Sequence, residues 1–184
     1  GLSRLVAPLP GGLLQTNVAG CAVFSAVSGS SVATAASIGR VALPQLLDRR
    51  YSRTLSTGSL AAGGTLGILI PPSIAMIIYG TFTQTSVPEL FMAALIPGLL
   101  LAGFFMVYIA VRALLSRDVA PKERVVESLR ALLVAVADVG PFAVLIVGTL
   151  GGLYLGIVTT TEAATIGCTL AILLSAVFGK LDVA

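Results

Sequence analysis

Histidine is absent from this chain of 184 residues, and charged residues make up only 10% of it. Without histidine the chain cannot supply a Ser–His catalytic pair, an HExxH zinc site or a histidine ligand for haem. A soluble domain carries about 25% charged residues, whereas 57% of this chain is hydrophobic. The composition therefore predicts an integral membrane protein and disfavours an enzyme embedded in the membrane.

Cysteine is also scarce, and the sequence contains no Walker A motif. Cys21 and Cys168 both lie in apolar surroundings, which predicts packing residues rather than a disulfide. The net charge of +3 predicts no nucleic-acid partner, because the basic residues fall between apolar segments and form no basic face. The chain begins at Gly1 without an initiator methionine, so we expect it to be an internal piece of a longer polypeptide.

Long uncharged segments are abundant, and the most informative of them runs from Gly58 to Gly80. Its 23 residues are enough for a helix to cross ~30 Å of hydrocarbon. Its middle carries residues that oppose a continuous helix, namely Gly63, Gly64, Gly67, Pro71 and Pro72. Open backbone groups cost several kcal/mol each in lipid, so a break here must pack in protein or line a cavity. We predict a broken transmembrane helix over 58–80; a kinked helix with closely packed glycines is the alternative.

Two shorter apolar segments, Leu13–Val27 and Val32–Leu47, precede this stretch. Each has about 15 residues, fewer than the ~20 that span a bilayer. The polar sequence Ser28-Gly29-Ser30-Ser31 lies between them. We predict a re-entrant helical hairpin over about 13–47 with Ser28–Ser31 as its tip. The alternative is one irregular helix with small-residue packing faces, but that helix would be over-long and would carry Arg40 inside it.

The positions of Lys and Arg predict the orientation in the membrane. Basic residues concentrate at 49–53 and 112–130, which we expect in the cytoplasm, whereas Thr81–Glu89 carries none and is expected outside. A helix over Leu90–Val111 joins the outer loop to the second basic segment. Within that segment, Pro121–Arg130 is predicted to form a short amphipathic helix at the membrane surface.

Three parts follow from this pattern. Residues 1–111 form the hairpin, the broken helix and the helix after it, and residues 112–130 form a basic cytoplasmic connector. Residues 131–184 are predicted to contain two further transmembrane helices, over 131–158 and 163–179.

Two acidic residues near the second half have competing interpretations. Thr159 and Glu162 match a capping box, in which each side chain bonds the other residue's backbone N–H, and this interpretation is preferred. Glu162 in a substrate or proton path is the alternative. Asp138 is expected at the membrane interface with a local partner, and a role in a proton relay is its alternative.

Four stretches resemble one protein family. They are PGGLLQTNVAG at 10–20, SGSSVATAASIGRVALPQL at 28–46, STGSLAAGGTLGILIPPSIAMIIYG at 56–80 and GIVTTTEAATIG at 156–167. Over nearly its whole length the chain is similar to the large membrane subunit, of DctM type, of the tripartite ATP-independent periplasmic (TRAP) transporters. It departs from the family pattern at Thr160, where the family usually has proline before the Thr-Glu pair.

The resemblance implies an all-α integral membrane protein, a helical transporter of the elevator type built on inverted repeats, of which this chain holds about half. It implies that residues 1–111 are part of the transport domain and that residues 131–184 begin the second repeat. It implies a permease, not an enzyme, that imports organic acids such as C4-dicarboxylates or sialic-acid-like solutes across a bacterial inner membrane. Na⁺ is the implied coupling ion, and no organic cofactor is implied. The implied partners are a small DctQ-type membrane subunit and a periplasmic DctP-type solute-binding protein.

The resemblance and the chemistry of the small polar residues predict the same site. Na⁺ is expected between the hairpin tip and the facing break, bound by Ser28, Gly29, Ser30, Ser31, Gly63, Gly64, Thr65 and Gly67. Half of a substrate site is expected from Ser30, Ser31, Thr65, Pro71 and Pro72. A channel or a structural membrane subunit without coupled transport is the alternative, since a channel needs no mirrored second repeat.

Overall fold

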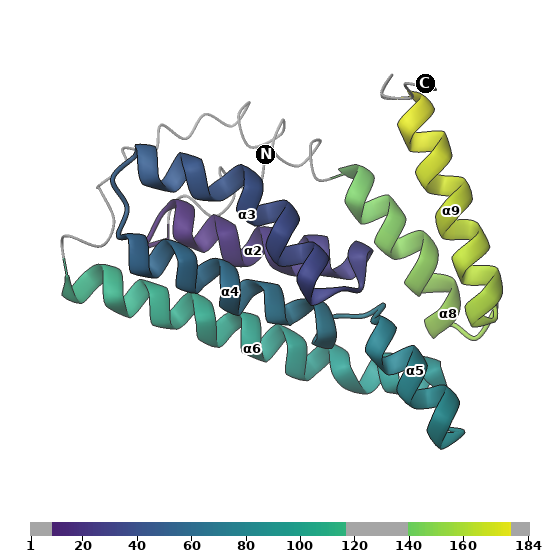
Figure 1. Cartoon of the computed structure of the whole chain (residues 1–184). Helices are drawn as coiled ribbons and strands as arrows, with labels where there is room; N and C mark the ends of the chain where they lie inside the picture. Colours follow the sequence, from purple (N-terminus) through teal and green to yellow (C-terminus); the bar gives the residue numbers. More distant parts are fainter. Residues whose placement is uncertain (1–8, 117–139, 178–184) are drawn as a thin grey trace.

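The computed structural model describes residues 9–116 and 140–177, and every regular element in these ranges is a helix. Figure 1 shows their arrangement. The elements are α2 (Leu13–Ser28), α3 (Ser31–Asp48), α4 (Arg53–Leu69), α5 (Ile74–Thr83), α6 (Val87–Leu115), a helix over Gly140–Tyr154 that contains the π-helical η1 (Val147–Gly151) and α8 (Gly152–Tyr154), and α9 (Thr160–Val177). By length and composition, Arg53–Thr83, α6 and α9 can each cross a membrane, which confirms a helical membrane protein.

Helices α2 and α3 form the predicted hairpin, and both arms end within one residue of their predicted limits. At its base, the Leu13 backbone N–H donates to the Tyr51 hydroxyl at 3.2 Å. Next to the tip, the hydroxyls of Ser25 and Thr34 lie 3.5 Å apart. The chain reverses at Gly29, whose φ of 60° is the left-handed conformation that glycine readily adopts at a helix end. The arms therefore return to the same end, whereas the re-entrant position in a bilayer stays a prediction.

The break in the second segment lies further along the chain than predicted. Residues 63–67 are helical within α4, and the chain leaves the helix only at Ile70–Ser73, before α5 begins. The prediction that the glycines form the interrupted part was therefore wrong. The two prolines decide the position, because each lacks an N–H and its ring disfavours helical backbone just before it.

The glycines of α4 instead let the helix approach the hairpin closely. An added Cβ would lie 2.8 Å from the Cys21 sulfur at Gly63, and 2.8 Å from the Ala35 Cβ at Gly64. This close packing explains why α4 tolerates glycines that would otherwise weaken a helix by ~1 kcal/mol each. Packing between α2, α3 and α4 thus forms the centre of the structure, with α6 beside it (Figure 1).

Helix α6 is longer than the predicted Leu90–Val111, because it begins at Val87 and continues through Arg112 to Leu115. Pro88 in its first turn is compatible with a helix start, where the missing N–H leaves no bond unmade. Arg112 therefore belongs to a helix and not to the connector.

The ends of the helices separate the charges as the sequence predicts. Ile109 of α6 packs in one cluster with Tyr51, close to the basic residues 49–53. A second cluster joins Phe91 to Leu153 and Ala163, and therefore places the α8–α9 turn near the start of α6. The proposed helix over 121–130 and Asp138 lie outside the described residues.

This arrangement makes a labelling prediction. With a membrane-impermeant thiol reagent added from the periplasm, Thr85→Cys should react and Ser52→Cys should not, because the two positions lie at opposite ends of α4–α5 and only the second lies beside basic residues. The same reagent on inside-out vesicles should reverse the pattern. Labelling of Ser52→Cys from the periplasm would contradict the orientation.

Candidate functional site

The hairpin tip meets the break of the second segment, and we call Ser28–Ser31 together with Ile70–Ser73 the tip–break junction. The Gly29 carbonyl accepts a hydrogen bond from the Ile74 backbone N–H at 3.2 Å. An added Cβ at Gly29 would lie 2.8 Å from the Pro72 carbonyl oxygen. The predicted proximity of tip and break is therefore present, through backbone atoms.

Four helix ends converge at this junction. Helices α2 and α4 end there, at Ser28 and Leu69, while α3 and α5 begin there, at Ser31 and Ile74. A helix end leaves backbone C=O groups with partial negative charge, and a helix start leaves N–H groups with partial positive charge. The junction can therefore offer carbonyls to a cation and N–H groups to a carboxylate.

The hydroxyl groups of the tip have partners within the hairpin. Ser28 and Thr34 hydroxyls lie 2.8 Å apart, and the Ser30 hydroxyl accepts from the Ala33 backbone N–H at 3.3 Å as the N-cap of α3. Thr34 is fully buried behind the tip. These bonds hold the tip in one conformation, although a serine hydroxyl keeps a lone pair for a second partner.

Ser73 is the polar residue of the junction that the site prediction missed. It is 1% exposed, and its hydroxyl has no hydrogen-bond partner in the described parts of the chain. Burying a hydroxyl without a partner costs roughly 1–3 kcal/mol, so a ligand oxygen or ion at this place would relieve that cost. Its position directly after Pro71-Pro72 was the signal available in the sequence.

Thr65 does not lie where the site prediction needs it. It is exposed, and its hydroxyl donates to the Ala62 carbonyl at 2.6 Å. Gly67, in contrast, contacts the tip, since an added Cβ there would lie 2.7 Å from the Ser31 nitrogen. Thr65 is on a different face of α4 from this contact, so the expectation that Thr65 and Ser30 point at one ion is wrong for this arrangement. The ion site itself stays a prediction.

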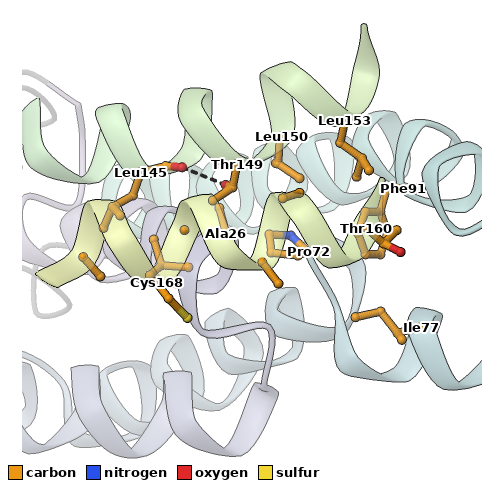
Figure 2. Close-up of a pocket in the computed structure, with 15 residues that line it drawn as sticks. Ala26, Pro72, Ile77, Phe91, Leu145, Thr149, Leu150, Leu153, Thr160 and Cys168 are labelled. Atoms are coloured by element: carbon orange, nitrogen blue, oxygen red, sulfur yellow. Dashed lines mark hydrogen bonds between the residues drawn. The ribbon is translucent and has the colours of Figure 1, made fainter. Parts of the chain in front are cut away.

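An apolar cavity of about 340 Å³ lies next to the junction (Figure 2). Its walls come from the end of α2, the break, α5, α6, the Gly140–Tyr154 helix and α9, with Ala26, Pro72, Phe91, Leu150 and Cys168 among the lining residues. The Thr149 hydroxyl in its wall donates to the Leu145 carbonyl at 2.7 Å. Since the lining includes no charged residue, this cavity offers little polar chemistry to an ion or a carboxylate.

Comparison with known proteins decides the family. The family model described as the DctM component of the tripartite ATP-independent periplasmic transporter matches residues 2–184. The chain belongs to this family. The DctM large permease of a C4-dicarboxylate TRAP transporter from Pseudomonas aeruginosa is 42% identical over 161 residues, which cover 88% of this chain and 37% of the relative.

Two further DctM-type relatives agree. The C4-dicarboxylate large permease DctM of Rhodobacter capsulatus is 39% identical, over 90% of this chain and 40% of its own length. The ectoine large permease TeaC of Halomonas elongata is 38% identical, over 90% of this chain and 38% of its own length. The chain thus spans about two-fifths of the length of the curated relatives that it matches.

The DctM turn that departs from the family pattern at Thr160 nevertheless forms the predicted capping box. Glu162 accepts from the Thr159 backbone N–H at 2.7 Å, and the Glu162 N–H donates to the Thr159 hydroxyl at 3.3 Å. The structural interpretation of Glu162 is therefore confirmed. Both cysteines are free, but only Cys21 is buried as the predicted packing residue should be, whereas Cys168 is exposed.

Proposed function

We propose that this DctM-family chain forms part of the large membrane subunit of a Na⁺-coupled secondary transporter that imports organic acids. The proposal includes a bacterial inner membrane, a small membrane subunit and a periplasmic binding protein as partners, as the tripartite description of the family suggests. The names of the relatives, which give C4-dicarboxylates and ectoine as their solutes, support small organic acids as the substrate class.

The observation that carries the proposal is the tip–break junction. It combines two helix C-termini, two helix N-termini and a buried hydroxyl without a partner at Ser73. In transporters, interrupted helices use such ends to bind coupling ions through carbonyls and anionic substrates through N–H groups. Among the described residues, no group of three His, Cys, Asp or Glu side chains lies together, so we propose that neutral oxygens bind Na⁺ here.

Coupling to Na⁺ is energetically sufficient. Each net positive charge that moves inward across about 100 mV, counted after the charge of the organic acid, contributes ~2.3 kcal/mol, so two net charges support an accumulation of about a thousandfold or more. The mechanism proposed is alternating access by an elevator-type movement of the hairpin and broken helix.

The test replaces Ser73 by alanine and measures organic-acid uptake against Na⁺ concentration. We expect the Na⁺ concentration for half-maximal uptake to rise about 5- to 30-fold, since losing one neutral ligand costs roughly 1–2 kcal/mol. Ser30→Ala should have the same direction of effect, because Ser30 also lies in the junction.

Thr65→Val is the matched control, because Thr65 lies in the same segment but on another face of α4. It should leave the Na⁺ dependence unchanged. If Ser73→Ala and Ser30→Ala also retain the original Na⁺ dependence while uptake stays measurable, the ion site is elsewhere.

A further inference from the structure

The side of α3 that faces away from α4 carries an unusual set of residues for a membrane helix. We call Ala33, Ser37, Arg40, Val41, Pro44 and Asp48 the outer stripe of α3. All six are exposed, and their spacing of three, four or one residues places them along one side of the helix. The opposite side is occupied, since Leu46 is buried and Ala35 packs on Gly64.

The outer stripe differs from the surface of α6, which has the composition of a lipid-facing helix. Between Leu90 and Val111 the large exposed residues of α6 are apolar or aromatic, for example Leu100, Phe104 and Val107, which are 57%, 67% and 60% exposed. The outer stripe instead contains the basic residue Arg40, the acidic residue Asp48 and the hydroxyl residue Ser37. Its other members are Ala33, Val41 and Pro44. Ionisable residues at membrane depth almost always face a protein interior or a water-filled cavity.

Arg40 is the central residue of the stripe. No acidic residue lies one turn away from it, because positions 36, 37, 43 and 44 are Ala, Ser, Leu and Pro. Asp48 on the same side is eight residues further on, about 12 Å along the helix axis, which is too far for a direct ion pair. Among the described residues no acidic side chain of α3 pairs with Arg40, so within this part of the chain the guanidinium is available to an anion that comes from outside the hairpin.

The stripe also connects two places that the proposed function links. It begins at Ala33, whose backbone N–H bonds the tip residue Ser30, and it ends at Asp48, beside the basic residues 49–53. A substrate anion that leaves the tip–break junction toward the cytoplasm would follow this side of α3.

We infer that the outer stripe of α3 lines a water-filled path between the tip–break junction and the basic end, and that Arg40 attracts organic anions along it. This inference rests on the proposed function for the nature of the anion. A positive side chain in a narrow aqueous path raises the local concentration of anions and the rate at which they move through it.

Thiol labelling in the intact protein, in inside-out membrane vesicles with its partner subunits, tests the path. The background carries Cys168→Ala and keeps Cys21, which is fully buried. A charged, membrane-impermeant methanethiosulfonate reagent should modify Ser37→Cys and Arg40→Cys at rates within about tenfold of Ser52→Cys at the basic end. Phe104→Cys, which is exposed on the apolar surface of α6, should react at least about a hundredfold more slowly, because the thiolate is the reacting form and hydrocarbon disfavours charge.

Ser37→Cys is the decisive position, since it lies one turn closer to the tip than Arg40. If it reacts as slowly as Phe104→Cys, lipid or protein covers the stripe and the inference is overturned. Labelling needs no transport, so this result is independent of whether uptake of organic acids is observed. An absence of uptake in the unmodified protein would overturn the proposed function instead.

Transport measurements test the role of Arg40. In low salt, Arg40→Gln should lower organic-anion flux about tenfold, the lower end of the usual range for electrostatic steering, and high salt should reduce the difference. Arg40→Lys keeps the charge and should retain most of the flux. Equal flux for Arg40→Gln and the unmodified protein at low salt would show that Arg40 does not attract the anion.

Discussion

Gly67→Val should disrupt the hairpin and abolish uptake. At Gly67 even a Cβ would lie 2.7 Å from the Ser30 carbonyl carbon and the Ser31 nitrogen. Both are backbone atoms, so no side-chain rotation relieves the contact, and the tip must move away from α4. Overpacking of a well-packed interior costs about 1–3 kcal/mol, and we expect the upper end here because valine adds two further methyl groups. For a cooperative folding unit of about 150–250 residues, ~3 kcal/mol corresponds to a midpoint of thermal unfolding about 6–12 °C lower.

Gly58→Val is the matched control for this prediction. Gly58 lies in the same helix, but an added Cβ there has no atom within 4 Å. It should therefore change the midpoint of thermal unfolding little and leave uptake intact. Equal midpoints for the two variants would mean that α4 and the tip do not pack as closely as the structure shows.

Gln15→Met should destabilise the base of the hairpin. Gln15 is 1% exposed, and its side-chain amide donates to the Pro10 and Met106 carbonyls, each at 2.9 Å. Methionine has a similar length but no donor, so both carbonyls lose this partner. Pro10 is exposed and Met106 is half-buried, so each lost bond costs about 0.5–1.5 kcal/mol. Removing the buried Gln15 side-chain oxygen, which has no partner among the described residues, offsets part of this cost, and we expect a net loss of about 1–2 kcal/mol.

The measurement is thermal unfolding in detergent, with Gln45→Met as control. Gln45 is exposed on α3, so its replacement should shift the midpoint little. The Met106 carbonyl belongs to α6, and the loss of its bond should also let the base of the hairpin separate from α6. A Gln15→Met protein as stable as the Gln45→Met protein would contradict the role of Gln15 as the link between hairpin and α6.

The elements that the sequence predicted well are those that local patterns define. Two apolar segments flanking Ser28–Ser31 predicted both hairpin arms to within one residue, because a run of small polar residues with a glycine ends one helix and caps the next. Thr159 and Glu162 predicted a capping box that the structure contains, since its bonds join residues three positions apart. The charges at 49–53 predicted which helix ends lie together.

The site was predicted less well, because it depends on contacts between distant residues. The sequence alone does not distinguish two roles for Gly63, Gly64 and Gly67. Glycines at these positions can interrupt a helix, or they can let the helix pack closely against a neighbour. Only the neighbouring hairpin, which fills the space where their side chains would be, makes a helix with three glycines favourable. Ser73 was missed for the same reason, since its burial depends on the hairpin and not on its neighbours in sequence.

By itself the sequence determined that this protein is a helical membrane protein of the DctM type, with a hairpin, an interrupted helix and basic residues at one end. Hydrophobic length, proline and glycine positions and charge distribution act locally, so they can be read along the chain. Only the tertiary structure decided that Gly63, Gly64 and Gly67 stay helical, that Thr65 turns away from the tip and that Ser73 is buried without a partner among the described residues. Each of these depends on how α4 and the break pack against the hairpin, and that packing joins residues about thirty to forty positions apart.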